Sequence, residues 1–259
     1  MRWFVISPWL VAALALLAVL VSGGRAHAAD APIPPHLPRY DLVVRLDTTA
    51  HTVGVRERVT WTNPTRQPVT ELAFNFYPHY SIPAGDELLL AKTLEMLRLS
   101  PSHGIDRAGH HGRFTDAVLL SQSGRPAGPP VPLEFDYDAA NPTTLRFRLP
   151  QPVGPGDTVT VELGVTIRLP NKQGRWGHWQ GVTYLTNALP LLAFCDDSGW
   201  RPMPFIPWHQ PWFNEAGVFT ATITLPADEV LVCPAVAKAE RVEDGWKTVE
   251  FQPFENCHR

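Results

Sequence analysis

Apolar and polar residues alternate in short segments along most of the chain. The clearest segment is 157–169, in which every second residue from Val159 to Ile167 is apolar and the residues between are mostly threonines and a glutamate. A period of two is typical of a β-strand with one buried face. Similar patterns predict strands over 40–47, 52–63, 70–77, 114–120, 132–137, 144–149, 183–194, 217–225, 230–236 and 246–251.

Two segments depart from this alternation. In 52–63, Glu57 interrupts a series of valines that ends at Trp61. Over 87–99, leucines would line one side of a helix, whereas Leu94 and Met96 could also begin a strand. We expect a short helical turn followed by a strand there.

These patterns predict the fold class. About ten strands separated by turns, with hardly any helix, indicate an all-β antiparallel sandwich or saddle of stacked sheets. The absence of βαβ alternation argues against a parallel α/β fold. Apolar residues make up 44% of the chain and charged residues 18%, as in packed globular proteins. The net charge of -3 gives no indication of nucleic-acid or anionic membrane partners.

The N-terminus has the three parts of a secretory signal peptide. Arg2 precedes an apolar run from Trp9 to Val21, and Ala26-His27-Ala28 forms a cleavage site. We predict a signal peptide over 1–28, a proline-rich linker over 29–39 and one domain over 40–259, secreted to the periplasm or the exterior. An uncleaved anchor is less favoured, because a spanning helix needs roughly 20 apolar residues. We expect no membrane span in the mature chain.

Cys195, Cys233 and Cys257 are the cysteines of the chain. An oxidising compartment would permit a bridge between Cys195 and Cys233. Buried free thiols are an equally good interpretation, and the sequence does not decide the pairing.

An aromatic and proline-rich segment, 196–213, precedes the strand predicted over 217–225. Its prolines fix φ and remove backbone donors, so it is neither a regular helix nor a central strand. Loops held by a rigid sheet often carry contact surfaces. The aromatic residues of the segment are Trp200, Phe205, Trp208, Trp212 and Phe213.

The same segment carries a family resemblance. Gly-Trp-Arg-Pro-Met-Pro-Phe at 199–205, Trp-Phe-Asn-Glu at 212–215 and the strand ending at Pro226 resemble the N-terminal β-domain of aminopeptidase N-like zinc metallopeptidases, especially their secreted bacterial branch. Arg201 stands where that family more often has histidine. Weaker motifs in the same order extend the resemblance over about residues 40 to 251.

The resemblance implies a peptidase in which zinc is bound through a His-Glu-x-x-His helix and a further glutamate. None of the ten histidines here is followed by glutamate. We therefore expect no catalytic residue, metal ligand or cofactor in this chain, and no peptidase activity from it alone. The family's catalytic zinc domain would follow Arg259, so the chain is expected to be the N-terminal domain, or a fragment, of such an enzyme. Its expected partners are that domain and a peptide substrate.

The resemblance also implies that the loop borders the substrate cleft. The candidate residues for this inter-domain contact are Asp196, Trp200, Arg201, Pro202, Met203, Pro204 and Phe205. An equally weighted alternative is that these side chains fill the core beneath the loop.

Other candidate sites have simpler interpretations. His103, His110 and His111 could bind a metal, but solvated loop histidines are the default. His178 and His209 could form a site with Asp196 and Asp197, although aromatic packing is favoured. The two aspartates do not suggest acid–base catalysis, because adjacent residues of an extended chain point apart.

A second function class stays open. A free-standing exported β-sandwich could bind a glycan or a protein through its aromatic loop, with Trp208 and Trp212 stacking on sugar rings.

Overall fold

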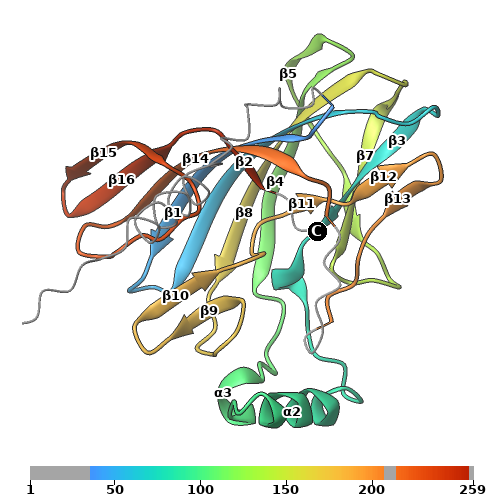
Figure 1. Ribbon diagram of the computed structural model, residues 1–259. Coiled ribbons are helices and arrows are strands. Elements are labelled where there is room, and N and C mark those ends of the chain that lie inside the picture. Colours follow the sequence, from blue (N-terminus) through green and yellow to red (C-terminus); the bar gives the residue numbers. More distant parts are fainter. Residues whose placement is uncertain (1–35, 207–213, 257–259) are drawn as a thin grey trace, which may run out of the picture. The chain divides into compact units, whose positions relative to one another are not determined.

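The computed structural model describes residues 36–206 and 214–256. These residues form β-sheets with a small helical segment, which confirms the all-β prediction (Figure 1). In this part of the chain, no helix is long and apolar enough to cross a membrane.

The largest sheet has nine strands, in the order β15-β16-β14-β1-β2-β8-β4-β5, with β17 pairing with β14. Its strands are β1 (Arg39–Asp47), β2 (Thr52–Thr62), β4 (Gly112–Gln122), β5 (Arg125–Pro132), β8 (Thr158–Arg168), β14 (Gly217–Pro226), β15 (Ala237–Glu243), β16 (Trp246–Phe251) and β17 (Phe254–Asn256). Neighbouring strands are antiparallel apart from β1 and β14, which are parallel with Arg39 opposite Val218. The prediction of an antiparallel fold is therefore wrong for this one pair of strands. Parallel pairing needs a long connection between the two strands, and the chain between β1 and β14 is long enough.

Three smaller sheets complete the described structure. One has the order β11-β3-β7-β6, and the others are the hairpins β9–β10 and β12–β13. Their bounds are β3 (Val69–Asn75), β6 (Phe135–Tyr137), β7 (Thr144–Val153), β9 (Trp176–Trp179), β10 (Val182–Leu185), β11 (Leu191–Leu192), β12 (Phe194–Asp196) and β13 (Gly199–Arg201). The helical elements are η1 (Tyr77–His79), α2 (Glu87–Met96) and α3 (Pro101–Gly104).

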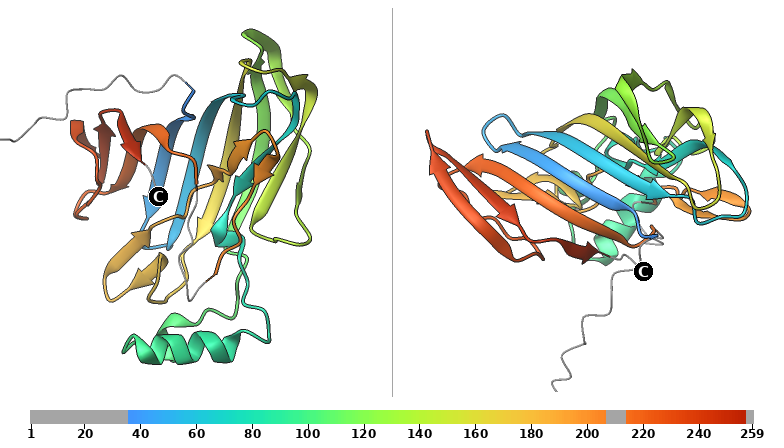
Figure 2. Two further views of the ribbon diagram at one scale, coloured as in Figure 1. Left: turned by 45° about the vertical axis from the view of Figure 1, so that its right-hand side comes forward. Right: turned by 90° about the horizontal axis from the view of Figure 1, so that it is seen from above.

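The core lies between the large sheet and the sheet that contains β3 and β7. Every second side chain of β1 and β2 is buried, as their alternation predicts. Phe147 of β7 is fully buried, and its ring centroid lies 5.6 Å from Phe114 of β4 and 5.4 Å from Phe74 of β3. Figure 2 shows the two sheets from two further sides. This packing confirms the predicted stacking of sheets.

Several predicted segments were wrong or incomplete, and some strands were not predicted. The segment 87–99 contains helix α2 but no following strand, because Arg98 takes a positive φ of 60° that ends the helix. The strand expected over 183–194 is divided into β10, β11 and β12, with Asn187 at φ 56° between them. The segment 230–236 is not a strand, since Val230 and Val232 are 85% and 89% exposed and lack a buried face. The strands that were not predicted are β5, β9, β13, β15 and β17. In β5 the reason is that its prolines and glycine are rare inside strands.

Glu57 is an acidic residue on the inner face of the large sheet. It lies on β2 opposite Leu42 and Leu163, and it is 0% exposed. Neither carboxyl oxygen has a hydrogen-bond partner among the described residues. Burial raises the pKa of Glu57 well above its ordinary value. The interruption seen in the sequence is thus a carboxyl group within the core.

The last residues of the predicted linker pair with the sheet. The carbonyl of Pro38 accepts a hydrogen bond of 2.9 Å from the backbone N–H of Val218. Residues 1–35, which carry the predicted signal peptide and most of the linker, lie outside the described residues.

Candidate functional site

The first six residues of the aromatic loop, 196–201, belong to the β12–β13 hairpin. Cys195 pairs with Trp200 and Asp196 with Gly199. The backbone of Gly199 has φ 98°, a conformation that side chains with a Cβ rarely adopt. The N–H of Ser198 donates to Asp196 Oδ1 over 2.9 Å, which closes the turn. The glycine that begins the family-like motif is therefore required by the turn geometry.

Trp200 attaches this hairpin to the body of the protein. Its ring lies 5.0 Å from that of Trp61 on β2, and its Nε1 donates a 2.9 Å hydrogen bond to the carbonyl of Glu71 on β3. A buried indole normally needs a partner for its N–H. Trp200 therefore connects the hairpin to both sheets of the core.

A buried pair of asparagines holds the segment that follows. The backbone N–H of Met203 donates to Asn75 Oδ1 over 3.1 Å, and Asn75 Nδ2 donates to Asn214 Oδ1 over 2.7 Å. Both asparagines are buried. Sequence reasoning missed Asn75, although a polar residue among the apolar residues of a predicted strand was a usable signal. These bonds fix the two ends of the segment between 203 and 214.

Phe205 packs in an aromatic cluster at the end of the described loop. Its ring centroid lies 4.7 Å from Tyr80, 4.9 Å from Trp176 and 5.6 Å from Tyr77. Residues 207–213, which include Trp208, His209 and Trp212, lie outside the described residues. The alternatives that depend on those three side chains remain predictions.

The seven candidate residues are brought together, and none of them is fully buried. Arg201 and Pro204 are exposed, while the other five are half-buried. Trp200 and Phe205 pack against the core, while Arg201 and Pro204 face solvent, so the inter-domain contact and the core-filling alternative both stay predictions. The half-buried residues are Asp196, Trp200, Pro202, Met203 and Phe205.

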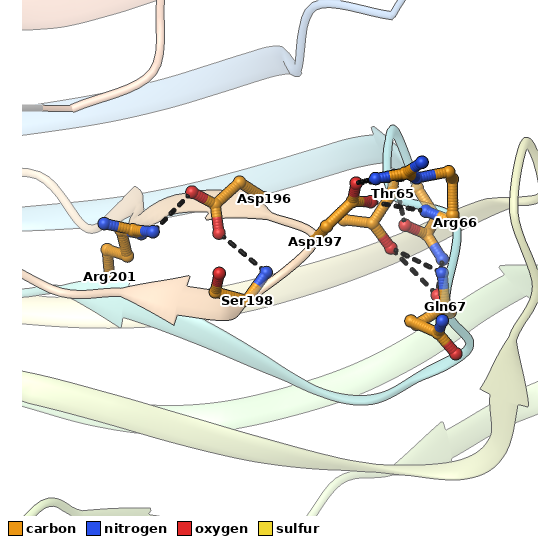
Figure 3. Close-up of polar contacts among 8 residues, drawn as sticks. Thr65, Arg66, Gln67, Asp196, Asp197, Ser198 and Arg201 are labelled. Carbon is orange, nitrogen blue, oxygen red and sulfur yellow. Dashed lines mark hydrogen bonds and ion pairs between the residues drawn. The ribbon is translucent and has the colours of Figure 1, made fainter.

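Asp196 and Asp197 point to different arginines (Figure 3). Asp196 forms a 2.8 Å ion pair with Arg201. Asp197 accepts hydrogen bonds from the backbone N–H of Arg66 over 2.9 Å and from its Nε over 2.7 Å. The side-chain bond with Arg66 lowers the pKa of Asp197 below its ordinary value. The two carboxylates therefore do not form a pair that could share a proton. This agrees with the sequence analysis, which predicted that they point apart.

A cleft of about 320 Å³ lies beside the hairpin. It is lined by Trp61, Cys195, Asp196, Asp197 and Glu215, together with His36, Pro38, Pro64, Ala193 and Phe194. Burial and, to a smaller extent, the charge of Asp196 raise the pKa of Cys195 to about 11. The thiol is therefore protonated at neutral pH and a poor nucleophile. Cys195 and Cys233 are both free, so they form no bridge, and Cys257 lies outside the described residues.

The histidines considered as metal ligands have separate neighbours. His111 Nε2 lies 2.5 Å from Asp106 Oδ2, whereas the ring of His110 contacts that of His79. The ring of His103 contacts Trp179, and His178 stacks on His51 at 3.5 Å. Within residues 36–206 and 214–256, no group of three or more histidine, cysteine or acidic residues could hold a metal ion.

Comparison with solved structures finds a likeness in fold. An M1 zinc metallopeptidase from Deinococcus radiodurans matches with a TM-score of 0.47 and 15% identity, over 83% of this chain and 38% of the metallopeptidase. A mutant of an M1 zinc metallopeptidase from that organism, bound to a Tyr-Ser-Ala substrate, matches with a TM-score of 0.46 and 16% identity over the same shares. At this level the likeness concerns the fold alone. No protein-family model and no curated protein matches the chain.

Proposed function

We propose that this chain is the non-catalytic N-terminal β-domain of a secreted aminopeptidase N-like zinc metallopeptidase. In this proposal the loop 196–205 rests on the catalytic zinc domain and borders the cleft that receives the peptide. The proposal assigns no zinc ligand and no catalytic residue to this chain.

One observation supports the proposal beyond the sequence motifs. The residues of the family-like motif form a surface that is held at three points and yet is left partly exposed. Trp200 is held by Trp61 and by the carbonyl of Glu71, Met203 by Asn75, and Phe205 by an aromatic cluster. A contact surface that is ordered before binding loses less conformational entropy when a partner docks.

The decisive experiment uses the zinc domain that this proposal expects downstream of Arg259. We expect an open reading frame there that contains His-Glu-x-x-His. Isothermal titration calorimetry of that domain against this chain is expected to show binding, which the exposed-loop variant Pro204→Asp weakens at least tenfold. Pro129→Asp, an exposed proline of β5, is the matched control and should leave binding unchanged. Equal binding by both variants would show that the loop is not the contact.

Activity assays test the non-catalytic part of the proposal. The purified chain is expected not to hydrolyse aminoacyl-arylamides. Hydrolysis that is lost on adding a chelator would contradict the assignment.

Export is a separate part of the proposal. We expect N-terminal sequencing of the exported protein to begin at Ala29. Recovery of the intact N-terminus in the membrane fraction would favour an uncleaved anchor instead. The glycan-binding alternative depends on Trp208 and Trp212, and no feature of the described residues favours it.

A further inference from the structure

A second cleft lies between the helical segment and the β9–β10 region. Its volume is about 90 Å³. Backbone and ring contacts hold its two sides together: the N–H of Gln173 donates to the carbonyl of His103 on α3 over 2.7 Å, and the ring of His103 lies 4.4 Å from Trp179 on β9. The residues that line the cleft are Tyr80, Ile82, Leu90, Leu94, Gly104, Asp106, Lys172, Gln173, Gly174, Arg175, Trp176 and Phe205.

Two hydrogen-bond donors in this cleft have no acceptor. The ammonium group of Lys172 makes no hydrogen bond to any described residue, and the carboxylate oxygen with which it forms an ion pair, Asp106 Oδ2, is 3.8 Å away. Trp176 is 2% exposed, and its Nε1 lacks a partner among the described residues. The two groups are neighbours, because Lys172 Nζ lies 4.9 Å from the centre of the Trp176 ring. A buried donor without an acceptor is costly, so the indole N–H of Trp176 indicates a missing acceptor.

One acceptor in the cleft also lacks a donor. The side-chain oxygen of Gln173 is buried and has no hydrogen-bond partner in the described structure. A ligand that satisfies all three groups must therefore present an anionic acceptor together with an N–H donor.

Asp106 does not fill this role for Lys172. Its Oδ2 already contacts His111 Nε2 at 2.5 Å, and its Oδ1 accepts from the backbone N–H of Ala108 at 3.1 Å. The ammonium group of Lys172 therefore keeps hydrogen-bond donors that an anionic acceptor can use.

The remaining wall of the cleft is apolar. It is lined by Leu90 and Leu94 of α2 together with Phe205 and Tyr80. A volume of this size accommodates about six water-sized groups, which is enough for a carboxylate with a short apolar side chain.

We propose that this cleft binds an α-carboxylate with an adjacent amide N–H and a small apolar side chain, as found in N-acyl amino acids and at the C-termini of peptides. The carboxylate accepts from Lys172 and Trp176, the amide N–H donates to Gln173, and the side chain packs on the leucines of α2. The site shares Phe205 with the loop contact proposed above, but its polar groups lie outside that loop. It stands whether or not this chain docks on a zinc domain.

The test compares ligands of one shape and different charge. Binding of N-acetyl-L-valine to the full chain is measured by calorimetry at pH 7 beside binding of its neutral amide. Because charged hydrogen bonds contribute more than neutral ones, the amide should bind at least about tenfold more weakly. Equal affinity for the acid and the amide, or no binding of the acid, would overturn the proposal without any variant.

Variants locate the site. Lys172→Met should weaken binding of the acid at least about tenfold, whereas Lys238→Met, which alters an exposed lysine of β15, should leave it unchanged. If Lys172→Met fails to fold by circular dichroism, Trp176→Phe removes the indole N–H while retaining an aromatic ring, and it should also weaken binding. Unchanged affinity in a folded Lys172 or Trp176 variant would contradict the assignment.

A last comparison separates the two sources of the ligand. A pentapeptide that ends in a free valine is titrated beside N-acetyl-L-valine and beside the same peptide with an amidated C-terminus. Tighter binding of the free peptide than of the acyl amino acid identifies a polypeptide C-terminus as the ligand. Weaker or equal binding identifies a small acyl amino acid.

Discussion

The inner face of the large sheet and the aromatic loop are stabilised in different ways. On β1, β2 and β8, almost every inward side chain is apolar and buried, so many similar contacts share the stabilisation. The loop 196–205 has few buried side chains and is held at a small number of individual contacts, such as that of Trp200 with Glu71. A sheet of the first kind resists unfolding as a whole, whereas a surface of the second kind can change one contact at a time.

The largest expected effect comes from the core. Phe147→Ala removes a side chain that is 0% exposed and packs on Phe74, Phe114 and Phe135. We expect the free energy of unfolding to fall by about 3–5 kcal/mol, because the cavity is surrounded by rigid strands. Urea unfolding measures this, with Val43→Ala, at an exposed position of β1, as the control. A loss below that of the control would show that the core is not tightly packed there.

Glu57 is the exception within the sheet, and its replacement should raise stability. Its pKa is raised in the folded protein, so the folded state disfavours ionisation that the unfolded chain undergoes above about pH 4.5. The resulting penalty is absent below that pH and grows as pH rises toward the folded-state pKa. Glu57→Leu should therefore add about 1–3 kcal/mol to the free energy of unfolding at pH 8.

The pH dependence distinguishes this cause from simple packing. Thermal unfolding of the Glu57→Leu variant and the parent should differ most at pH 8 and converge toward pH 4.5. A difference that does not change with pH would mean that packing and not ionisation is its cause. A destabilised variant at pH 8 would mean that the carboxyl has a stabilising partner.

In the loop, Trp200→Phe retains an aromatic ring and removes the hydrogen bond to the carbonyl of Glu71. We expect a loss of about 1 kcal/mol, with increased hydrogen exchange in the β12–β13 hairpin and unchanged exchange in β2 and β8. An equal increase of hydrogen exchange in the hairpin and in the large sheet would show that the two regions do not open independently.

The smallest effect is expected at the tip of the hairpin. Arg66 and Asp197 form an ion pair at the surface, and such pairs contribute little to stability. Arg66→Ala should leave the thermal midpoint unchanged within error, but it should return the pKa of Asp197 upward toward its ordinary value, as measured by NMR titration. A clear fall in the thermal midpoint would show that this pair holds the tip of the hairpin to the connection between β2 and β3.

Part of this structure follows from alternation along the chain. The strands expected over 40–47, 52–63, 157–169 and 217–225 are present as β1, β2, β8 and β14, with the predicted side chains inward. The divergence of Asp196 and Asp197 was also predictable, because neighbouring side chains of an extended chain point to opposite sides.

Other features depend on contacts between residues distant in the sequence. Alternation shows which face of a strand is buried but not which strand lies beside it, so the parallel pairing of β1 with β14 could not be predicted. The same reason applies to Met203 and Asn75, which are joined by a hydrogen bond, and to the buried indole N–H of Trp176, which has no partner among the described residues. The sequence by itself determined strands β1, β2, β8 and β14 and the aromatic, proline-rich character of the loop. Only tertiary structure decided which polar groups found partners, because a partner exists only once distant segments are folded against each other.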